Sequence, residues 1–254
     1  MLLCRQMLLW RREYVATVAQ FVSYVVSGVV IGAMFSNIKV NQDEQLTLAI
    51  SFSLDVFGIM SFLQLGLFIK DRAIFNREVA ANYYQTSAYF LAKAVSSLPI
   101  HLLVGLPFFT ILYFWVGFAD GSFENYLFFS LVCYMTQLTM AGLHEAIGST
   151  FRSLDTALVV AGTLNVLTMT LSGVTSNFPN LPSYLQPFYW MSPLTYATSA
   201  LLVMEFEGTP EGQAWISEIG VQITDKWENV WILAIFLVAL RFTTYLPLRF
   251  LHRL

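Results

Sequence analysis

Charged residues and cysteines are scarce in this sequence. Of its 254 residues, 11% are charged and 57% are hydrophobic, a composition too apolar for an ordinary soluble domain. The two cysteines, Cys4 and Cys133, fall near the start of the chain and inside an apolar stretch, so they predict neither an extracellular disulfide framework nor a metal cluster. We expect no bound metal and no nucleic-acid partner.

Motifs of membrane hydrolases and carriers are also missing. His101, His144 and Glu145 lie in apolar stretches, yet no HExxH or GxSxG motif accompanies them. Inverted repeats, which are typical of proton-coupled carriers, are not visible either. An intramembrane enzyme and a proton-coupled carrier are therefore disfavoured, whereas a pore built from several subunits stays open.

Long apolar stretches dominate what is present. Each is close to the roughly 20 residues that a helix needs to cross about 30 Å of hydrocarbon. The stretches cover residues 15–35, 46–69, 88–116, 126–148, 156–174 and 230–248. We therefore predict an all-α polytopic membrane protein with six transmembrane helices, forming a single membrane domain over residues 1–254.

The basic residues between these stretches fall almost entirely on alternate sides. The N-terminal segment, the second and fourth loops and the C-terminal tail contain Arg5, Arg11, Arg12, Lys70, Arg72, Arg77, Lys93, Arg152, Arg249 and Arg253. The other loops contain only Lys39 and Lys226. Because cytoplasmic loops are enriched in Lys and Arg, both termini are predicted to be cytoplasmic and the 175–229 loop to lie outside. We expect a multi-pass protein among membrane lipids, in the plasma membrane.

Two segments at the predicted cytoplasmic side have helical patterns. Residues 1–14 place apolar side chains on one stripe, which predicts an amphipathic helix in the headgroup plane. Residues 70–85 are dense in charge, aromatics and amides, and helical spacing puts Phe75, Val79 and Asn82 on one side. This pattern is expected of a short cytoplasmic helix that docks onto another protein, with an interfacial helix resting on lipid as the alternative.

A segment of the predicted outer loop, residues 176–196, is rich in proline and aromatics. It is too broken for a membrane span and too apolar for a free loop. We predict an outer re-entrant region of short helices, with Tyr184, Phe188, Tyr189 and Trp190 at headgroup depth.

Ionisable residues inside the spans are costly, by about 2.5–3.5 kcal/mol for Asp, Lys or Arg at a helix centre. Arg241 is expected to snorkel to the inner interface. Glu145 is expected to pair with a basic group of the cytoplasmic belt or of another span. Asp55, near the middle of the second stretch, must be protonated, paired or exposed to water, and its facing a central cavity is one of these possibilities.

Several different short motifs follow one another along the chain. The first group is Phe75-Asn76-Arg77-Glu78, Asn82-Tyr83-Tyr84, Tyr89-Phe90-Leu91-Ala92-Lys93, Leu98-Pro99 and Tyr113-Phe114. The second group is Ser172-Gly173, Trp190-Met191-Ser192-Pro193-Leu194-Thr195-Tyr196, Leu201-Leu202-Val203 and Glu205-Phe206. In their order and spacing over nearly the whole chain, these motifs resemble the membrane domain of ATP-binding-cassette exporters of the G subfamily, the white and pleiotropic-drug-resistance type.

The resemblance implies one half of a type-2 exporter, which pairs with a second half as a homodimer or heterodimer. The substrate path would run between spans two and five of each partner. By this resemblance, and from the position of Asp55, the expected path residues are Asp55, Val56, Ile59, Val166, Met169 and Val174. In such exporters the helix around Glu78 contacts the nucleotide-binding domain. The expected coupling residues are Arg77, Glu78, Tyr83 and Tyr84.

Family members of this kind also carry an ATPase domain before the lead helix. This sequence contains no GxxxxGK[ST] loop, so we do not expect it to bind a cofactor or to be an enzyme by itself. ATP and Mg²⁺ would be bound by a partner nucleotide-binding domain. Either the sequence is a fragment, or a separate ATPase binds it.

The expected function is ATP-driven export of lipids, sterols or hydrophobic drugs by alternating access. The alternative is a non-transporting membrane scaffold or truncated regulatory subunit that dimerises with full-length transporters.

Overall fold

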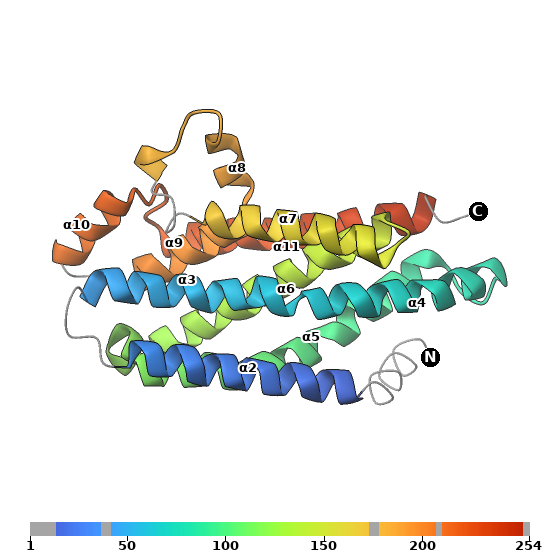
Figure 1. Cartoon of the computed structure of the whole chain (residues 1–254), viewed down its shortest axis with the longest axis horizontal. Helices are drawn as coiled ribbons and strands as arrows, with labels where there is room; N and C mark the ends of the chain where they lie inside the picture. Colours follow the sequence, from blue (N-terminus) through green and yellow to red (C-terminus); the bar gives the residue numbers. More distant parts are fainter. Residues whose placement is uncertain (1–13, 37–41, 173–177, 207–209, 251–254) are drawn as a thin grey trace.

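The structure is a computed structural model that describes residues 14–36, 42–172, 178–206 and 210–250. Within these ranges the chain forms α-helices joined by loops and short π or 3₁₀ turns, and no strand. The long helices run side by side along the longest axis of the molecule, the short helix α10 lies at one end, and α8 projects above the long helices (Figure 1). The start of α2, the end of α11 and the turn between α4 and α5 all lie at the opposite end (Figure 1).

The helix boundaries confirm the all-α polytopic membrane architecture. The long helices are α2 (Tyr14–Phe35), α3 (Gln42–Met60), α4 (Phe62–Ala80), α5 (Thr86–Leu112), α6 (Phe123–Thr150), α7 (Leu154–Thr170) and α11 (Lys226–Phe250). Among the described residues, five helical segments are long and apolar enough to cross a membrane, with α3 and α4 counted as one, and α7 is apolar but has only 17 residues. The described residues of all six predicted stretches therefore fall mainly on helices, and the count of six crossings stays a prediction.

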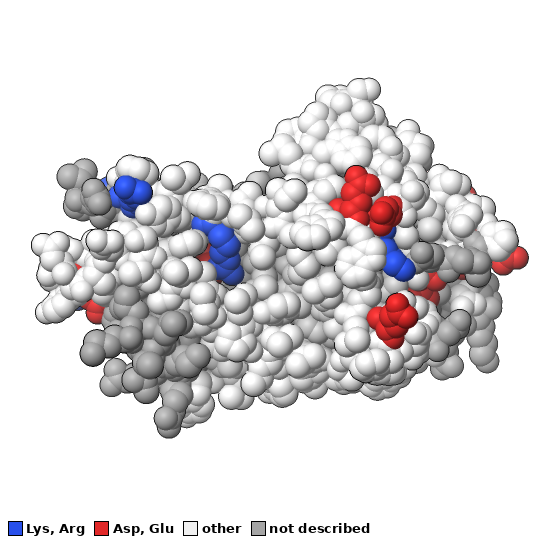
Figure 2. Space-filling view, turned by 180° about the vertical axis from the view of Figure 1, so that it is seen from behind, with Lys and Arg blue, Asp and Glu red and all other residues white. Residues whose placement is uncertain are grey.

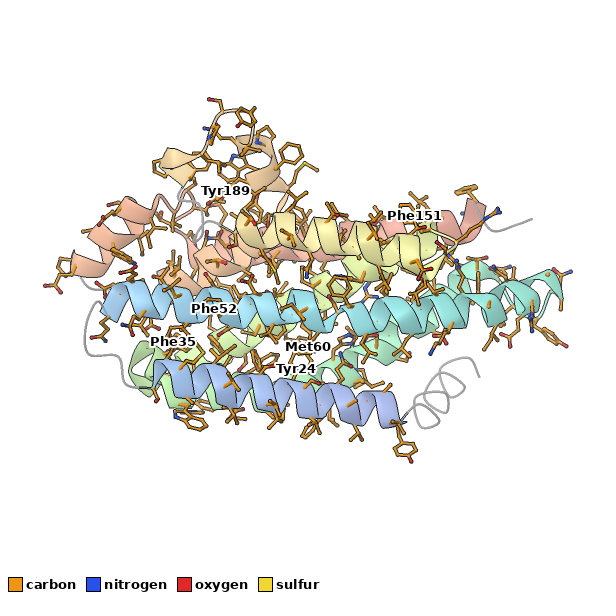
Figure 3. All side chains as sticks on the ribbon, in the orientation of Figure 1. Tyr24, Phe35, Phe52, Met60, Phe151 and Tyr189 are labelled. Carbon is orange, nitrogen blue, oxygen red and sulfur yellow. The ribbon has the colours of Figure 1, made fainter. Side chains whose placement is uncertain are left out.

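The surface agrees with a membrane location. Apolar side chains cover the outer faces of the long helices (Figure 3). On the face shown in Figure 2, a wide band between the two ends is nearly free of charged side chains. In water such a surface would be unfavourable, whereas hydrocarbon solvates it without cost.

The predicted outer region contains short helices, as expected of a re-entrant segment. These are η3 (Phe178–Asn180), α8 (Gln186–Met191), α9 (Pro193–Phe206) and α10 (Pro210–Ile219). At 14 residues α9 is too short to span a bilayer, yet nearly all of its side chains are buried, and it packs against α3, α6 and α11. The ring of Tyr189 is buried and contacts Phe178 and Trp190, and the headgroup depth of this region stays a prediction.

The helix predicted over residues 70–85 is not a separate element. Residues up to Ala80 continue α4, which follows α3 after a single turn residue, Ser61. The apolar side of this segment is used inside the molecule: Phe75 is 2% exposed and its ring centroid lies 4.5 Å from that of Tyr89. A separate docking helix is therefore corrected to a helical extension of the second span. The amphipathic helix predicted at residues 1–14 falls almost entirely outside the described residues.

Candidate functional site

The predicted substrate path lies on two neighbouring helices, α3 and α7. Their approach is close at Gly58, where a Cβ atom would overlap the Oδ1 of Asn165. Glycine therefore allows α7 to pack against the middle of the second span. Val174, predicted near an outer gate, lies outside the described residues.

The structure places the remaining path residues in different environments. Ile59 is 55% exposed and Val166 is 63% exposed, while Asp55 and Met169 are half-buried. Val56 is 9% exposed and belongs to the hydrophobic core instead. Four of the predicted path residues thus have access to the surface of this chain, and Val56 packs inside it.

One face of α3 forms a continuous stripe of exposed and half-buried side chains, which we call the α3 stripe. It consists of Leu48, Phe52, Asp55 and Ile59, spaced four, three and four residues apart as one helix face requires. No side chain in the described part of the protein is hydrogen-bonded to Asp55. A carboxylate on an apolar membrane face needs water, a cation or a partner group, so this stripe is suited to a cavity or to contact with another molecule.

The predicted coupling residues divide into two pairs at the opposite end of α4. Arg77 is exposed, and Tyr83 is 78% exposed, so both are available to another protein. Tyr84 donates a hydrogen bond of 2.5 Å to the Glu78 carboxylate. Its ring also stacks on Tyr89, with centroids 5.8 Å apart. Glu78 and Tyr84 are therefore held by contacts within the chain and fix the shape of the turn that carries Tyr83.

The sequence analysis missed the role of Arg72, which it counted only as a basic loop residue. The Arg72 guanidinium is buried and donates to the carbonyl oxygens of Gly148, Phe151 and Arg152, at 2.6, 2.7 and 3.2 Å. These carbonyls belong to the end of α6 and the loop before α7. A cation at a helix C-terminus satisfies acceptors that have no partner inside the helix. Arg72 thereby ties the extension of α4 to α6 and α7.

A buried ion pair joins α6 to α11. Arg241 donates to the Glu145 carboxylate at 2.5 Å, and their side chains are 14% and 5% exposed. The pairing of Glu145 with a basic group of another span is confirmed. That Arg241 snorkels to the inner interface stays a prediction.

A hydrogen bond fixes the junction of α3 and α4. The Ser61 hydroxyl donates to the Gly58 carbonyl at 2.7 Å and also lies 2.8 Å from His144 Nδ1 on α6. His144 thus supports the junction of α3 and α4. In the described part of the chain, no group of three or more His, Cys, Asp or Glu residues is arranged to hold a metal ion.

An apolar cavity of about 320 Å³ lies beside the short helix α8 and the start of α9. Its walls include Leu164 and Leu167 of α7, Met191 of α8, and Phe236 and Leu240 of α11. Such a cavity can hold an apolar group and offers little to a charged one.

Known proteins match this chain over much of its length. The family described as "ABC-2 type transporter" matches residues 1–206. ABC transporter G family member 24 of Dictyostelium discoideum is 26% identical across 98% of this chain, and the match covers 23% of that protein. The ABC multidrug transporter MDR1 of Trichophyton interdigitale is 26% identical across 76% of this chain and 13% of its own length.

A relative from Caenorhabditis elegans, the ABC transporter ATP-binding protein/permease wht-1, is 31% identical across 54% of this chain and 20% of its own length. The chain thus spans less than a quarter of each of these relatives. The matches confirm the resemblance to the G subfamily that the motifs indicate. With its polytopic helical fold and a family match over most of its residues, this chain belongs to the ABC-2 type transporter family and is a membrane domain of that kind.

Proposed function

We propose that residues 1–254 form one membrane domain of an ATP-driven exporter that moves lipids, sterols or hydrophobic drugs across the plasma membrane by alternating access. A nucleotide-binding domain, in the same protein or in a partner, supplies ATP and Mg²⁺. A second membrane half, identical or different, completes the path. Both termini and the extension of α4 face the cytoplasm.

The α3 stripe is the observation that carries this proposal. It offers a mainly apolar surface with one carboxylate, Asp55, which suits apolar or amphipathic cargo better than sugars or inorganic ions. The apolar cavity beside α7 supports the same cargo class. The multidrug relative is named for a similar activity. Cargo would move along the stripe as ATP binding draws the two halves together and displaces the extension of α4.

The experiment is ATP-dependent uptake of a fluorescent sterol and a hydrophobic dye into inside-out vesicles from cells that express the protein at its natural length. Uptake above that of vesicles without the protein is expected. No uptake, combined with reduced activity of a co-expressed full-length transporter, would contradict the proposal and favour a silencing subunit.

Asp55→Asn is expected to change cargo preference more than stability. The substitution removes a charge that lies in an apolar stripe, so uptake of a cationic amphiphile should fall about tenfold, equivalent to about 1.4 kcal/mol, while uptake of a neutral sterol stays near normal. Asp43→Asn is the matched control, because Asp43 lies in the first turn of the same helix, far from its middle. Equal effects on both cargoes would contradict a role in selectivity.

Glu78→Ala is expected to separate ATP hydrolysis from transport. Loss of the Glu78 carboxylate removes the bond to Tyr84 and frees the turn that presents Tyr83, so cargo-stimulated hydrolysis should be lost and transport should fall about tenfold, the effect of one charge-assisted hydrogen bond. Tyr84→Phe removes the same bond and keeps the ring, so it should reproduce the defect. Normal cargo-stimulated hydrolysis in both variants would show that this bond has no part in coupling.

A further inference from the structure

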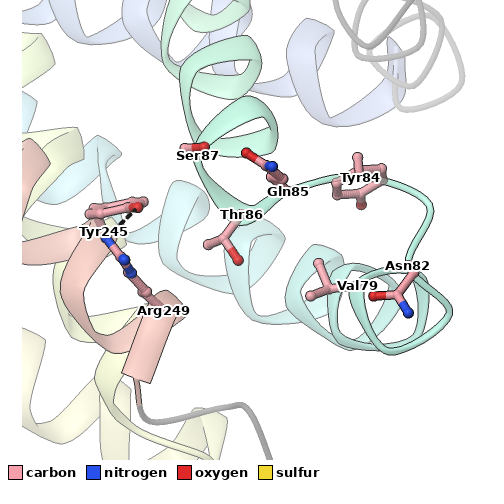
Figure 4. Close-up of a pocket in the computed structure, with 8 residues that line it drawn as sticks. All are labelled: Val79, Asn82, Tyr84, Gln85, Thr86, Ser87, Tyr245 and Arg249. Atoms are coloured by element: carbon pink, nitrogen blue, oxygen red, sulfur yellow. Dashed lines mark hydrogen bonds between the residues drawn. The ribbon is translucent and has the colours of Figure 1, made fainter.

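A polar pocket lies between the α4–α5 turn and the end of α11, and the proposed function assigns it no ligand (Figure 4). Its volume is about 420 Å³. The polar residues on its walls are Asn82, Tyr84, Gln85, Thr86, Ser87, Tyr245 and Arg249. No carboxylate lines it. The pocket therefore offers hydrogen-bond donors and one positive charge, but no negative charge.

Arg249 supplies that charge from the last turn of α11. It is exposed, and its guanidinium donates to the Tyr245 hydroxyl at 3.4 Å, a long bond to a neutral group. Among the described residues it forms no ion pair, so most of its five N–H donors are available to a ligand. The nearby Glu78 carboxylate is occupied by the hydroxyl of Tyr84 and lies outside the pocket wall.

Thr86 contributes a hydroxyl to the same pocket. The residue is only 9% exposed, and its hydroxyl has no hydrogen-bond partner in the described part of the chain. Figure 4 shows its side chain extending from the start of α5 into the space between Val79 and Arg249. This hydroxyl stays accessible from the pocket, so a ligand there can take over the hydrogen bond that water otherwise makes.

The start of α5 adds further donors to the same space. Gln85 makes no side-chain capping bond, and the first turn of α5 contains no acidic residue. The amides of Ala88 and Tyr89 bond to the Gln85 carbonyl, which leaves the amides of Thr86 and Ser87 without a partner in the helix. Free amides at a helix start favour anionic oxygens.

We propose that this pocket binds a phosphate group, and that the phosphate belongs to the headgroup of a membrane phospholipid. A guanidinium and clustered neutral donors match phosphate oxygens in number and charge. The lipid source follows from α11, where Phe242, Leu246 and Phe250 form an exposed apolar stripe next to Arg249. The acyl chains of a bound phospholipid would lie along this stripe while its phosphate enters the pocket.

Native mass spectrometry of the protein at its natural length, purified in detergent, tests this site with dioctanoyl phosphatidic acid as the probe. Dioctanoylglycerol, which has the same chains and no phosphate, should bind far more weakly. Arg249→Gln should weaken binding of the phosphatidic acid about tenfold, and Thr86→Val about threefold. Arg152→Gln, which alters an exposed arginine outside the pocket, is the control and should bind normally.

Three outcomes decide the matter. Weaker binding of the phosphatidic acid in both pocket variants, with the control unchanged, supports the site. Inorganic phosphate that displaces the lipid at equal concentration would retain the phosphate site and overturn its assignment to lipid. Normal binding in Arg249→Gln and Thr86→Val, or equal binding of dioctanoylglycerol, would overturn the proposal. Binding needs neither ATP nor cargo, so this result is independent of the transport experiment.

Discussion

Arg241→Met is expected to lower the free energy of unfolding by about 3–5 kcal/mol, because it leaves Glu145 buried without its counter-charge. The Glu145 side chain is 5% exposed and Arg241 is its partner across the α6–α11 interface. A carboxylate in hydrocarbon is stable only if it is paired, protonated or hydrated. Unfolding of the purified protein with sodium dodecyl sulfate, followed by tryptophan fluorescence, measures the loss.

The double variant Arg241→Met/Glu145→Leu separates the cost of an unpaired charge from the loss of packing. Replacing both partners of a buried ion pair with apolar residues is often neutral or stabilising, so the double variant should regain most of the stability lost by the single one. Arg249→Met on the same helix is the matched control and should unfold normally, because Arg249 is exposed. A double variant as unstable as Arg241→Met would show that the arginine stabilises through packing instead.

The positions of the long helices could be predicted because the bilayer imposes both their length and their composition. Apolar stretches of about 20 residues have one low-energy structure in hydrocarbon, a helix that satisfies its own backbone. The break at Ser61 could not be predicted in this way, since its hydroxyl contacts His144, 83 residues further along the chain. Helical periodicity also cannot distinguish a new helix over residues 70–85 from the extension of α4.

The sequence predicts which residues of the candidate site matter, but not which groups they contact. Composition marked Asp55, Glu145 and Arg241 as costly, and so identified where tertiary partners were needed. It could not assign the partner, because a salt bridge between α6 and α11 depends on how distant helices pack. The role of Arg72 was the hardest to predict, because a basic residue is expected at the predicted cytoplasmic end whether or not it binds other groups.

Arg72→Met is expected to lower the free energy of unfolding by about 2–4 kcal/mol, because it removes charge-assisted hydrogen bonds and leaves buried carbonyl oxygens at the end of α6 without donors. The guanidinium reaches three carbonyls at once, and Arg72 is 7% exposed. If this contact also transmits movement from the extension of α4 to α6 and α7, transport should fall further than the amount of folded protein does.

Arg72→Lys distinguishes charge from geometry. An ammonium group retains the favourable charge at the end of α6 but cannot reproduce the planar fork that contacts Gly148, Phe151 and Arg152 together. The free energy of unfolding of Arg72→Lys should therefore lie between that of the wild type and that of Arg72→Met. Transport and ATP hydrolysis, each corrected for the amount of folded protein, should both be normal if Arg72 only stabilises the bundle. Hydrolysis that persists while transport falls in both variants would instead show that the link between α4 and the α6–α7 loop carries the movement.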